Sequence, residues 1–178
     1  VVVGQNVRRF DLKKLRARAI LHGLPPFREP KVIDTMEMAK GTGAFTSNKL
    51  EYLSAHLTDE PKSKHLKYPG FELWAGIMRG EIAAWDEMKK YNLKDVTATE
   101  KVYLALRPWA ARLPNLAQFY DDELLRCPRC GSVNLVGHGT VTSNVSEYKQ
   151  YVCSDCHGYS RSRYTSNSKA KRVSLLAT

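Results

Sequence analysis

Hydrophobic residues recur at steps of three and four, the helical period, along most of the first half of the chain. This spacing predicts helices over residues 11–22, 47–57, 72–89 and 91–106. Gly80 is expected to break the third of these helices into two. Short apolar runs at residues 1–4 and 31–34 predict strands. We therefore expect an α/β fold in which helices pack on a mixed sheet and helix outweighs strand.

The pattern changes in the second half, where strand-like runs at 133–142 and 147–152 predict a β-hairpin. The polar stretch before it predicts a linker, and the polar, basic end of the chain predicts a mobile tail. These changes divide the chain into a helix-rich domain over 1–109, a linker over 110–124, a small β-rich module over 125–160 and a basic tail over 161–178.

The composition is that of a basic globular protein. Hydrophobic residues make up 43% of the 178 positions, and no apolar run approaches the roughly 20 residues that span a membrane. Lys and Arg number 28 against 18 Asp and Glu, and the net charge of +10 favours a polyanionic partner, most simply nucleic acid. The basic residues cluster near both ends of the chain. The candidate nucleic-acid contacts are Arg8, Arg9, Lys13, Arg161 and Arg163.

All four cysteines lie in the β-rich module, as two Cys-x-x-Cys pairs. This spacing is typical of a structural Zn²⁺ site, in which four thiolates stand at the corners of a tetrahedron. Two disulfides are the alternative, but no signal peptide precedes the pairs and Cys-x-x-Cys is a tight span for a bridge. We expect one Zn²⁺ to fold the module, with Gly131 relieving the first tight turn. The predicted ligands are Cys127, Cys130, Cys153 and Cys156.

Two acids of the first domain stand where a carboxylate could serve a catalytic metal ion. Asp11 lies at a predicted strand-to-helix junction, where capping the helix is the simpler role. Asp95 lies within a predicted helix, four residues after Tyr91 and on the same face. Divalent cations held by carboxylates hydrolyse phosphodiesters, so the pair indicates a Mg²⁺ or Mn²⁺ site. Asp34 is expected to cap a turn and is assigned no chemistry.

These residues resemble two motifs of a nuclease family. Asn6 to Asp11, after an apolar strand, resembles the second motif of the DEDD 3′–5′ exonucleases, Asn-xxx-Phe-Asp. Tyr91 with Asp95 is similar to the third motif, Tyr-xxx-Asp, which marks the DEDDy subgroup. The order of these motifs and the cysteine module after them are similar to phage-encoded ribonuclease H-like exonucleases with a C-terminal zinc ribbon. Further residues that carry the resemblance are Asp34, Thr35, Asn48, Leu50, Trp74, Tyr103 and Trp109.

The resemblance implies that residues 1–109 are the C-terminal part of a ribonuclease H-like domain and that 125–160 form a zinc ribbon. It implies a 3′–5′ exonuclease that works by two-metal-ion hydrolysis, with DNA favoured over RNA as the substrate. Asp11 and Asp95 would bind Mg²⁺ or Mn²⁺, Tyr91 would orient the attacking water, and Asn6 would support the substrate or Asp11. The family's first motif, an Asp-x-Glu on the opening strand, has no counterpart at the start of this sequence. We expect the chain to begin inside the domain, with activity depending on an upstream segment or companion chain.

The expected partners are single-stranded DNA or 3′ ends, and a replication protein or companion chain. No membrane partner is expected, and the expected location is the cytoplasm, that of the bacterial host if a phage encodes the protein. An alternative function is a non-catalytic nucleic-acid-binding protein, in which a truncated ribonuclease H-like core and a zinc ribbon bind without cleaving. A third is a protein–protein adaptor that docks through its ribbon.

Overall fold

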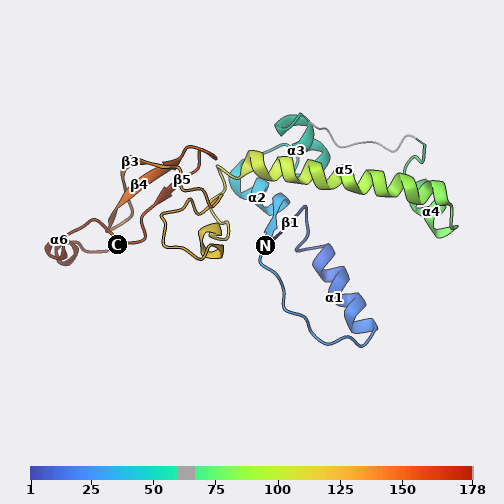
Figure 1. Ribbon diagram of the computed structural model, residues 1–178, viewed down its shortest axis with the longest axis horizontal. Coiled ribbons are helices and arrows are strands. Elements are labelled where there is room, and N and C mark those ends of the chain that lie inside the picture. The colour runs from blue at the N-terminus through green and yellow to red at the C-terminus, as the bar shows by residue number, and fades with distance from the viewer. Residues whose placement is uncertain (60–66, 178) are drawn as a thin grey trace. The chain divides into compact units, whose positions relative to one another are not determined.

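The protein divides into two compact units, Val1–Leu106 and Arg107–Thr178. The computed structural model describes residues 1–59 and 67–177. Both units combine helices with a small sheet (Figure 1), so the chain is a mixed α/β protein, as predicted. Within the described residues, no helix is both long and apolar enough to cross a membrane.

The N-terminal unit holds a two-stranded parallel sheet and helices around it. Its elements are β1 (Val2–Gly4), α1 (Asp11–Leu21), β2 (Val32–Asp34), α2 (Thr35–Thr42), α3 (Leu50–Leu57), α4 (Glu72–Met78) and α5 (Ile82–Leu106). Val2 lies opposite Val32 and Gly4 opposite Asp34 in the parallel pair. Parallel strands need a long crossover connection, and α1 with the loop after it supplies one.

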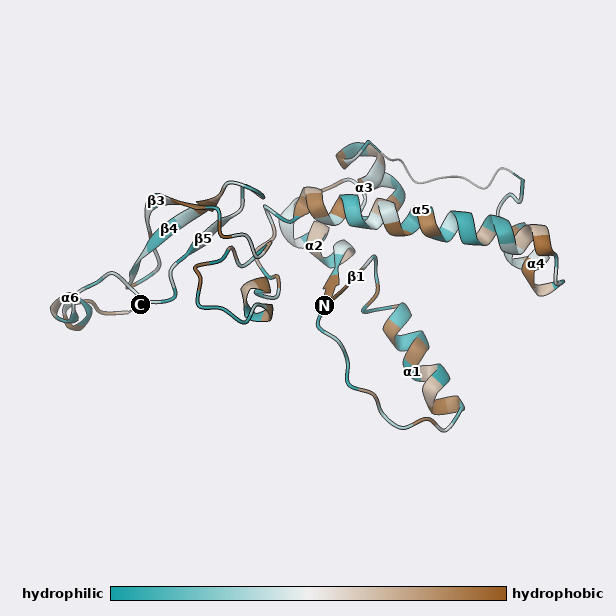
Figure 2. Ribbon diagram, viewed as in Figure 1, coloured by the Kyte–Doolittle hydropathy of each residue, from teal (hydrophilic) through white to brown (hydrophobic). Residues whose placement is uncertain are grey.

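Helix α5 is the element on which the N-terminal unit assembles. It contacts α2, α3, α4 and β1, and Figure 1 shows α4 near one of its ends and α2 and α3 near the other. Figure 2 shows hydrophilic and hydrophobic residues alternating along α5, as expected for a helix covered on one side only. The buried residues of α5 are Ala84, Ala98, Val102 and Leu106.

The helical boundaries follow the sequence signals only in part. Gly80 separates α4 from α5 as predicted, and its φ of +81° suits glycine. The predicted break between residues 89 and 91 is wrong, because α5 continues through Lys89 and Lys90. No glycine or proline lies between Ile82 and Leu106, so nothing in the backbone interrupts the helix there.

Two further differences concern the helices around β2. Leu12 and Ala19 are buried on α1, but Leu15, which shares their helical face, is 54% exposed and Ile20 is 76% exposed, so the apolar face of this helix is covered only in part. Helix α2 was not predicted. It starts because the Asp34 carboxylate accepts the amide of Met36, a helix-capping hydrogen bond.

The C-terminal unit is built on a three-stranded antiparallel sheet in the order β3-β4-β5. Its elements are a 3-10 helix η1 (Leu116–Phe119), β3 (Leu135–Thr142), β4 (Glu147–Cys153), β5 (Tyr159–Arg161) and α6 (Lys169–Ser174). Strands β3 and β4 confirm the predicted hairpin. The third strand and the short helix in the basic tail were not predicted.

The segment expected as a linker, 110–124, is instead held by the rest of the C-terminal unit. The Leu116 amide donates to the Pro128 carbonyl at 2.8 Å. The Arg129 guanidinium donates to the carbonyls of Arg107, at 3.1 Å, and of Ala110. The chain between α5 and the first cysteine turn therefore packs against that turn.

Candidate metal centre and carboxylate cleft

Each Cys-x-x-Cys pair lies in a tight turn that ends in a left-handed residue. In the first turn the Gly131 amide donates to the Cys127 carbonyl at 2.8 Å, and Gly131 has φ +80°. In the second turn the His157 amide donates to the Cys153 carbonyl at 2.8 Å, and His157 has φ +57°. The predicted role of Gly131 is confirmed, and His157 takes the equivalent backbone position in the second turn.

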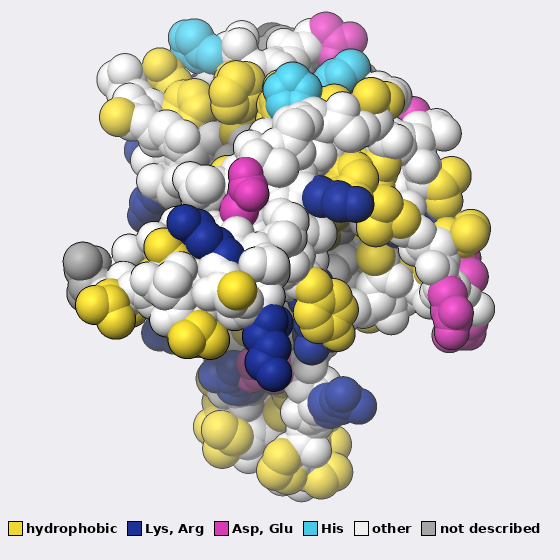
Figure 3. Space-filling model, turned by 90° about the vertical axis from the view of Figure 1, so that its left-hand side faces the viewer, with side chains coloured by type: hydrophobic (Ala, Val, Ile, Leu, Met, Phe, Trp, Pro, Cys, Tyr) yellow, Lys and Arg dark blue, Asp and Glu magenta, His cyan; other side chains and the backbone are white. Residues whose placement is uncertain are grey.

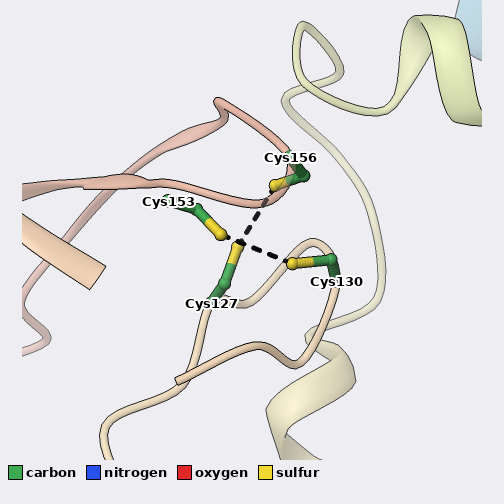
Figure 4. A group of neighbouring side chains, drawn as sticks. All are labelled: Cys127, Cys130, Cys153 and Cys156. Atoms are coloured by element: carbon green, nitrogen blue, oxygen red, sulfur yellow. Dashed lines mark hydrogen bonds between the residues drawn. The ribbon is translucent and has the colours of Figure 1, made fainter. Parts of the chain in front are cut away.

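The four sulfur atoms point toward one another (Figure 4) and all lie within 4.8 Å of one another. The Sγ atoms of Cys127 and Cys156 are 3.6 Å apart, as are those of Cys130 and Cys153. A disulfide would need about 2.05 Å. A tetrahedron with Zn–S bonds of about 2.3 Å has edges of about 3.8 Å. The cluster therefore fits a four-cysteine Zn²⁺ site, as predicted, and not two disulfides.

Burial and backbone amides set the charge state of the sulfurs. Burial raises the pKa of the Cys130 and Cys156 thiols. Burial also acts to raise the pKa of Cys153, but hydrogen bonds from the amides of Cys156 and Asp155 outweigh it and bring this pKa down to about 7. Zn²⁺ binds thiolates, so a bound ion displaces the remaining protons and its affinity falls as the pH falls.

Replacing Gly131 with alanine is expected to destabilise the C-terminal unit by about 2 kcal/mol. The new Cβ would need the left-handed φ of +80° and would lie 2.5 Å from the Tyr120 hydroxyl oxygen. Gly137→Ala is the matched control, because its Cβ meets no atom within 4 Å and its φ lies outside the left-handed region. Thermal unfolding of both variants measures the difference, and equal stability of the two would contradict this account.

A second candidate site is a cleft of about 830 Å³ in the N-terminal unit. Asp11, the first residue of α1, and Asp95, in the middle of α5, both line it, although they lie far apart in the sequence. Glu51 of α3 and Glu100 of α5 line the same cleft. Tyr91, predicted to share this site, is not among the described residues that line it.

The loop before Asp11 is fixed by a residue to which the sequence assigned no chemistry. The buried Asp34 carboxylate accepts the amides of Asn6, at 2.9 Å, and of Arg8, at 3.0 Å, in addition to that of Met36. Asn6 has φ +59°, a conformation that asparagine tolerates better than most residues. The predicted site residue Asn6 therefore contributes its backbone to the turn that leads into α1. An Asp directly after a buried apolar run is the signal that could have revealed this role.

The acids of the cleft do not form a complete metal cage. Across residues 1–59 and 67–177, the four cysteines are the one group of three or more His, Cys, Asp or Glu side chains close enough to hold a single ion. Asp11 and Asp95 thus stand on the wall of one cleft with Glu51 and Glu100, but no three of these acids lie close enough to hold one ion. A Mg²⁺ or Mn²⁺ site of the predicted kind is not complete in this arrangement.

The basic residues predicted near the N-terminus differ in their surroundings. The Arg8 guanidinium donates to the Val32 carbonyl at 2.6 Å and pairs with Glu37 at 3.2 Å, so this arginine helps to hold β2 in place. Arg9 and Lys13 are exposed.

The basic residues predicted near the C-terminus line a cleft of about 530 Å³ in the C-terminal unit. Arg161 and Arg163 share its wall with Arg126 and Arg129, and no Asp or Glu is among the described residues that line it. On the face of the molecule in Figure 3, some Lys and Arg side chains stand apart among hydrophobic and uncharged ones, and several gather in the lower centre of the view.

Comparisons of the chain with protein-family models, with curated protein sequences and with solved structures gave no match.

Proposed function

We propose that this chain is part of a 3′–5′ exonuclease acting on DNA, with a ribonuclease H-like N-terminal unit and a zinc-ribbon C-terminal unit. One observation carries the proposal: Asp11 and Asp95, the two acids of the exonuclease-like motifs, line the same cleft. Asp11 opens a helix just after β1, and Asp95 lies on the helix that contacts β1. Two acids from distant motifs on one cleft wall suit a site that acts on a phosphodiester.

The proposed site needs more carboxylates than Asp11 and Asp95 provide. In the proposed enzyme they come from the family's first motif, supplied by another segment of the full protein or by a companion chain. Mg²⁺ or Mn²⁺ would then be the catalytic ion, and Tyr91, one helical turn before Asp95, would orient water.

The charge of the chain supports nucleic acid as the substrate. A net charge of +10 gives a salt-dependent attraction to phosphates, and the arginine-lined cleft of the C-terminal unit holds no acid among its described lining residues. Zn²⁺ has a structural role here, because four thiolates leave no open position for water.

The proposal predicts that Asp95→Asn abolishes nuclease activity while the fold persists. A 5′-labelled single strand is incubated with Mg²⁺ or Mn²⁺ and the protein, together with the segment or companion chain that supplies the first motif, and shortening from the 3′ end is followed. Loss of a metal-ligating carboxylate removes several kcal/mol of transition-state stabilisation, so the rate should fall by about a hundredfold or more. Asp86→Asn is the matched control, because Asp86 also lies on α5 but forms an exposed ion pair with Lys89. Equal rates for the Asp95 variant and the unsubstituted protein would overturn the proposal.

The second candidate is a nucleic-acid-binding protein without nuclease activity. The observation in its favour is that the described acids of the cleft fall short of a metal cage. The same assay separates the two functions. The binder is favoured if nucleic acid binds in a salt-dependent way but is not shortened with Mg²⁺ or Mn²⁺. The same result should hold for the protein that carries every segment of the natural chain.

A further inference from the structure

One face of the β3–β4–β5 sheet combines aromatic, basic and apolar side chains. The strand register places Val152 between Val136 and Tyr159, and Gln150 beside Arg161. Side chains alternate along a strand, so Tyr148 lies on the same face as Gln150 and Val152. We refer to this surface as the ribbon face, formed by Val136, His138, Tyr148, Gln150, Val152, Tyr159 and Arg161.

The planar groups of the ribbon face are held in place by their neighbours and remain open to solvent. The Arg161 guanidinium lies 3.8 Å from the centre of the Tyr148 ring, so the ring supports its plane from one side. The Tyr159 ring meets the His138 ring edge-on, with centroids 5.1 Å apart. Tyr159 is nevertheless 49% exposed, and Arg161 is exposed as well.

The ribbon face carries positive charge and no acid. Within the described strands β3 to β5, the acidic residue is Glu147, which lies on the opposite face by alternation with Tyr148. Its carboxylate accepts the Thr140 hydroxyl there at 2.8 Å. A partner that complements this face offers negative charge together with flat apolar surfaces.

We propose that the ribbon face is a stacking platform for the unpaired bases of single-stranded nucleic acid. This inference rests on the proposed nucleic-acid function and assigns the strandedness of the partner. One base stacks on the Tyr159 ring and another on the Arg161 guanidinium plane, which Tyr148 supports from beneath. A duplex keeps its base faces paired and stacked internally, so it cannot use these two surfaces.

The test compares two oligonucleotides with the same number of phosphates, one of deoxythymidine and one of abasic sites. The unsubstituted full chain should bind the base-bearing strand about tenfold or more tightly, because stacking on an aromatic ring or guanidinium adds to phosphate contacts. Tyr159→Ala should lower this preference about tenfold and leave the affinity for the abasic strand unchanged. Tyr159→Phe keeps the ring and should keep the preference.

Arg161→Lys separates stacking from charge. Lysine keeps the positive charge but lacks the guanidinium plane, so only the base-bearing strand should bind more weakly. Lys149→Ala is the control, because this exposed lysine lies on the opposite face of the same sheet. The zinc content of each variant reports whether the C-terminal unit is folded.

The outcomes distinguish this inference from the proposed function. Equal affinity of the unsubstituted protein for both oligonucleotides would overturn the platform and leave the nuclease proposal standing. If the preference for the base-bearing strand survives both Tyr159→Ala and Arg161→Ala, the stacking surface lies elsewhere, and the proposed platform is overturned. Failure to bind either oligonucleotide would overturn the platform and the proposed function together.

Discussion

Cys153→Ser is expected to unfold the C-terminal unit and to abolish tight binding of one Zn²⁺ per chain. Structural four-ligand Zn²⁺ sites contribute about 10–16 kcal/mol of binding free energy at pH 7, and this energy is largely folding energy. Cys153 ends β4, and its amide donates to the Gly158 carbonyl at 3.1 Å, so the ligand also closes the second turn. Besides the cysteines, few residues of this unit's β-sheet are completely buried, so its hydrophobic core is too small to keep the sheet folded without the ion.

Metal content measured with a chromogenic chelator, together with amide NMR spectra, tests this expectation. Signals of β3 to β5 should collapse while those of the N-terminal helices persist, because the two units have separate cores. Ser154→Ala is the control, since Ser154 is exposed and hydrogen-bonds through its backbone amide. A Cys153 variant that still holds one Zn²⁺ per chain with unchanged spectra would show that the ion is not ligated by these four cysteines.

Asp34→Ala should destabilise the N-terminal unit by about 2 kcal/mol or more. Asp34 is 4% exposed and its carboxylate accepts three amides, so alanine removes a helix cap and leaves the amides of Asn6 and Arg8 without this acceptor. Loss of a cap costs about 1 kcal/mol, and losing the acceptor of two part-buried amides adds about 1 kcal/mol or more, less than for fully buried amides. The turn that leads into Asp11 should loosen at the same time.

Urea unfolding followed by helical circular dichroism measures the effect of Asp34→Ala. Asp59→Ala is the control, because Asp59 forms an exposed ion pair with Lys101 at 2.9 Å, and such surface pairs contribute little to stability. If both variants unfold at the same urea concentration, Asp34 has no special role in fixing the turn.

The metal centre could be predicted from sequence because its chemistry depends on residue type and spacing alone. Four cysteines in two short pairs restrict the geometry before any tertiary contact is known, and the structure brings their sulfurs together. The role of Asp34 depends instead on amides that lie almost thirty positions earlier in the chain, on a loop whose path follows from strand pairing. An Asp directly after an apolar run indicates a capping role, but no local pattern identifies the distant amides that it accepts.

The helices show the same division between local and long-range causes. Gly80 was recognised as a break because glycine acts through its own backbone. The exposure of Ile20 and Leu15 could not be predicted, since burial depends on which elements lie against α1. The motifs around Asp11 and Asp95 predicted a shared site, and both acids do line one cleft, but the sequence pattern placed Tyr91 there as well.

The contact between β1 and α5 has a consequence for folding during synthesis. The cleft cannot form until α5, which ends at Leu106, has left the ribosome, because its walls include residues of β1 and α5, the first and the last elements of the N-terminal unit. Synthesis proceeds at roughly 5–20 residues per second, so β1 emerges on the order of 5–20 s before α5 is complete and can contact it. The strands of the C-terminal unit are neighbours in the sequence, so their contact order is low and their pairing is fast. Holdase chaperones should therefore bind nascent chains that end before α5, and release them once this helix is complete.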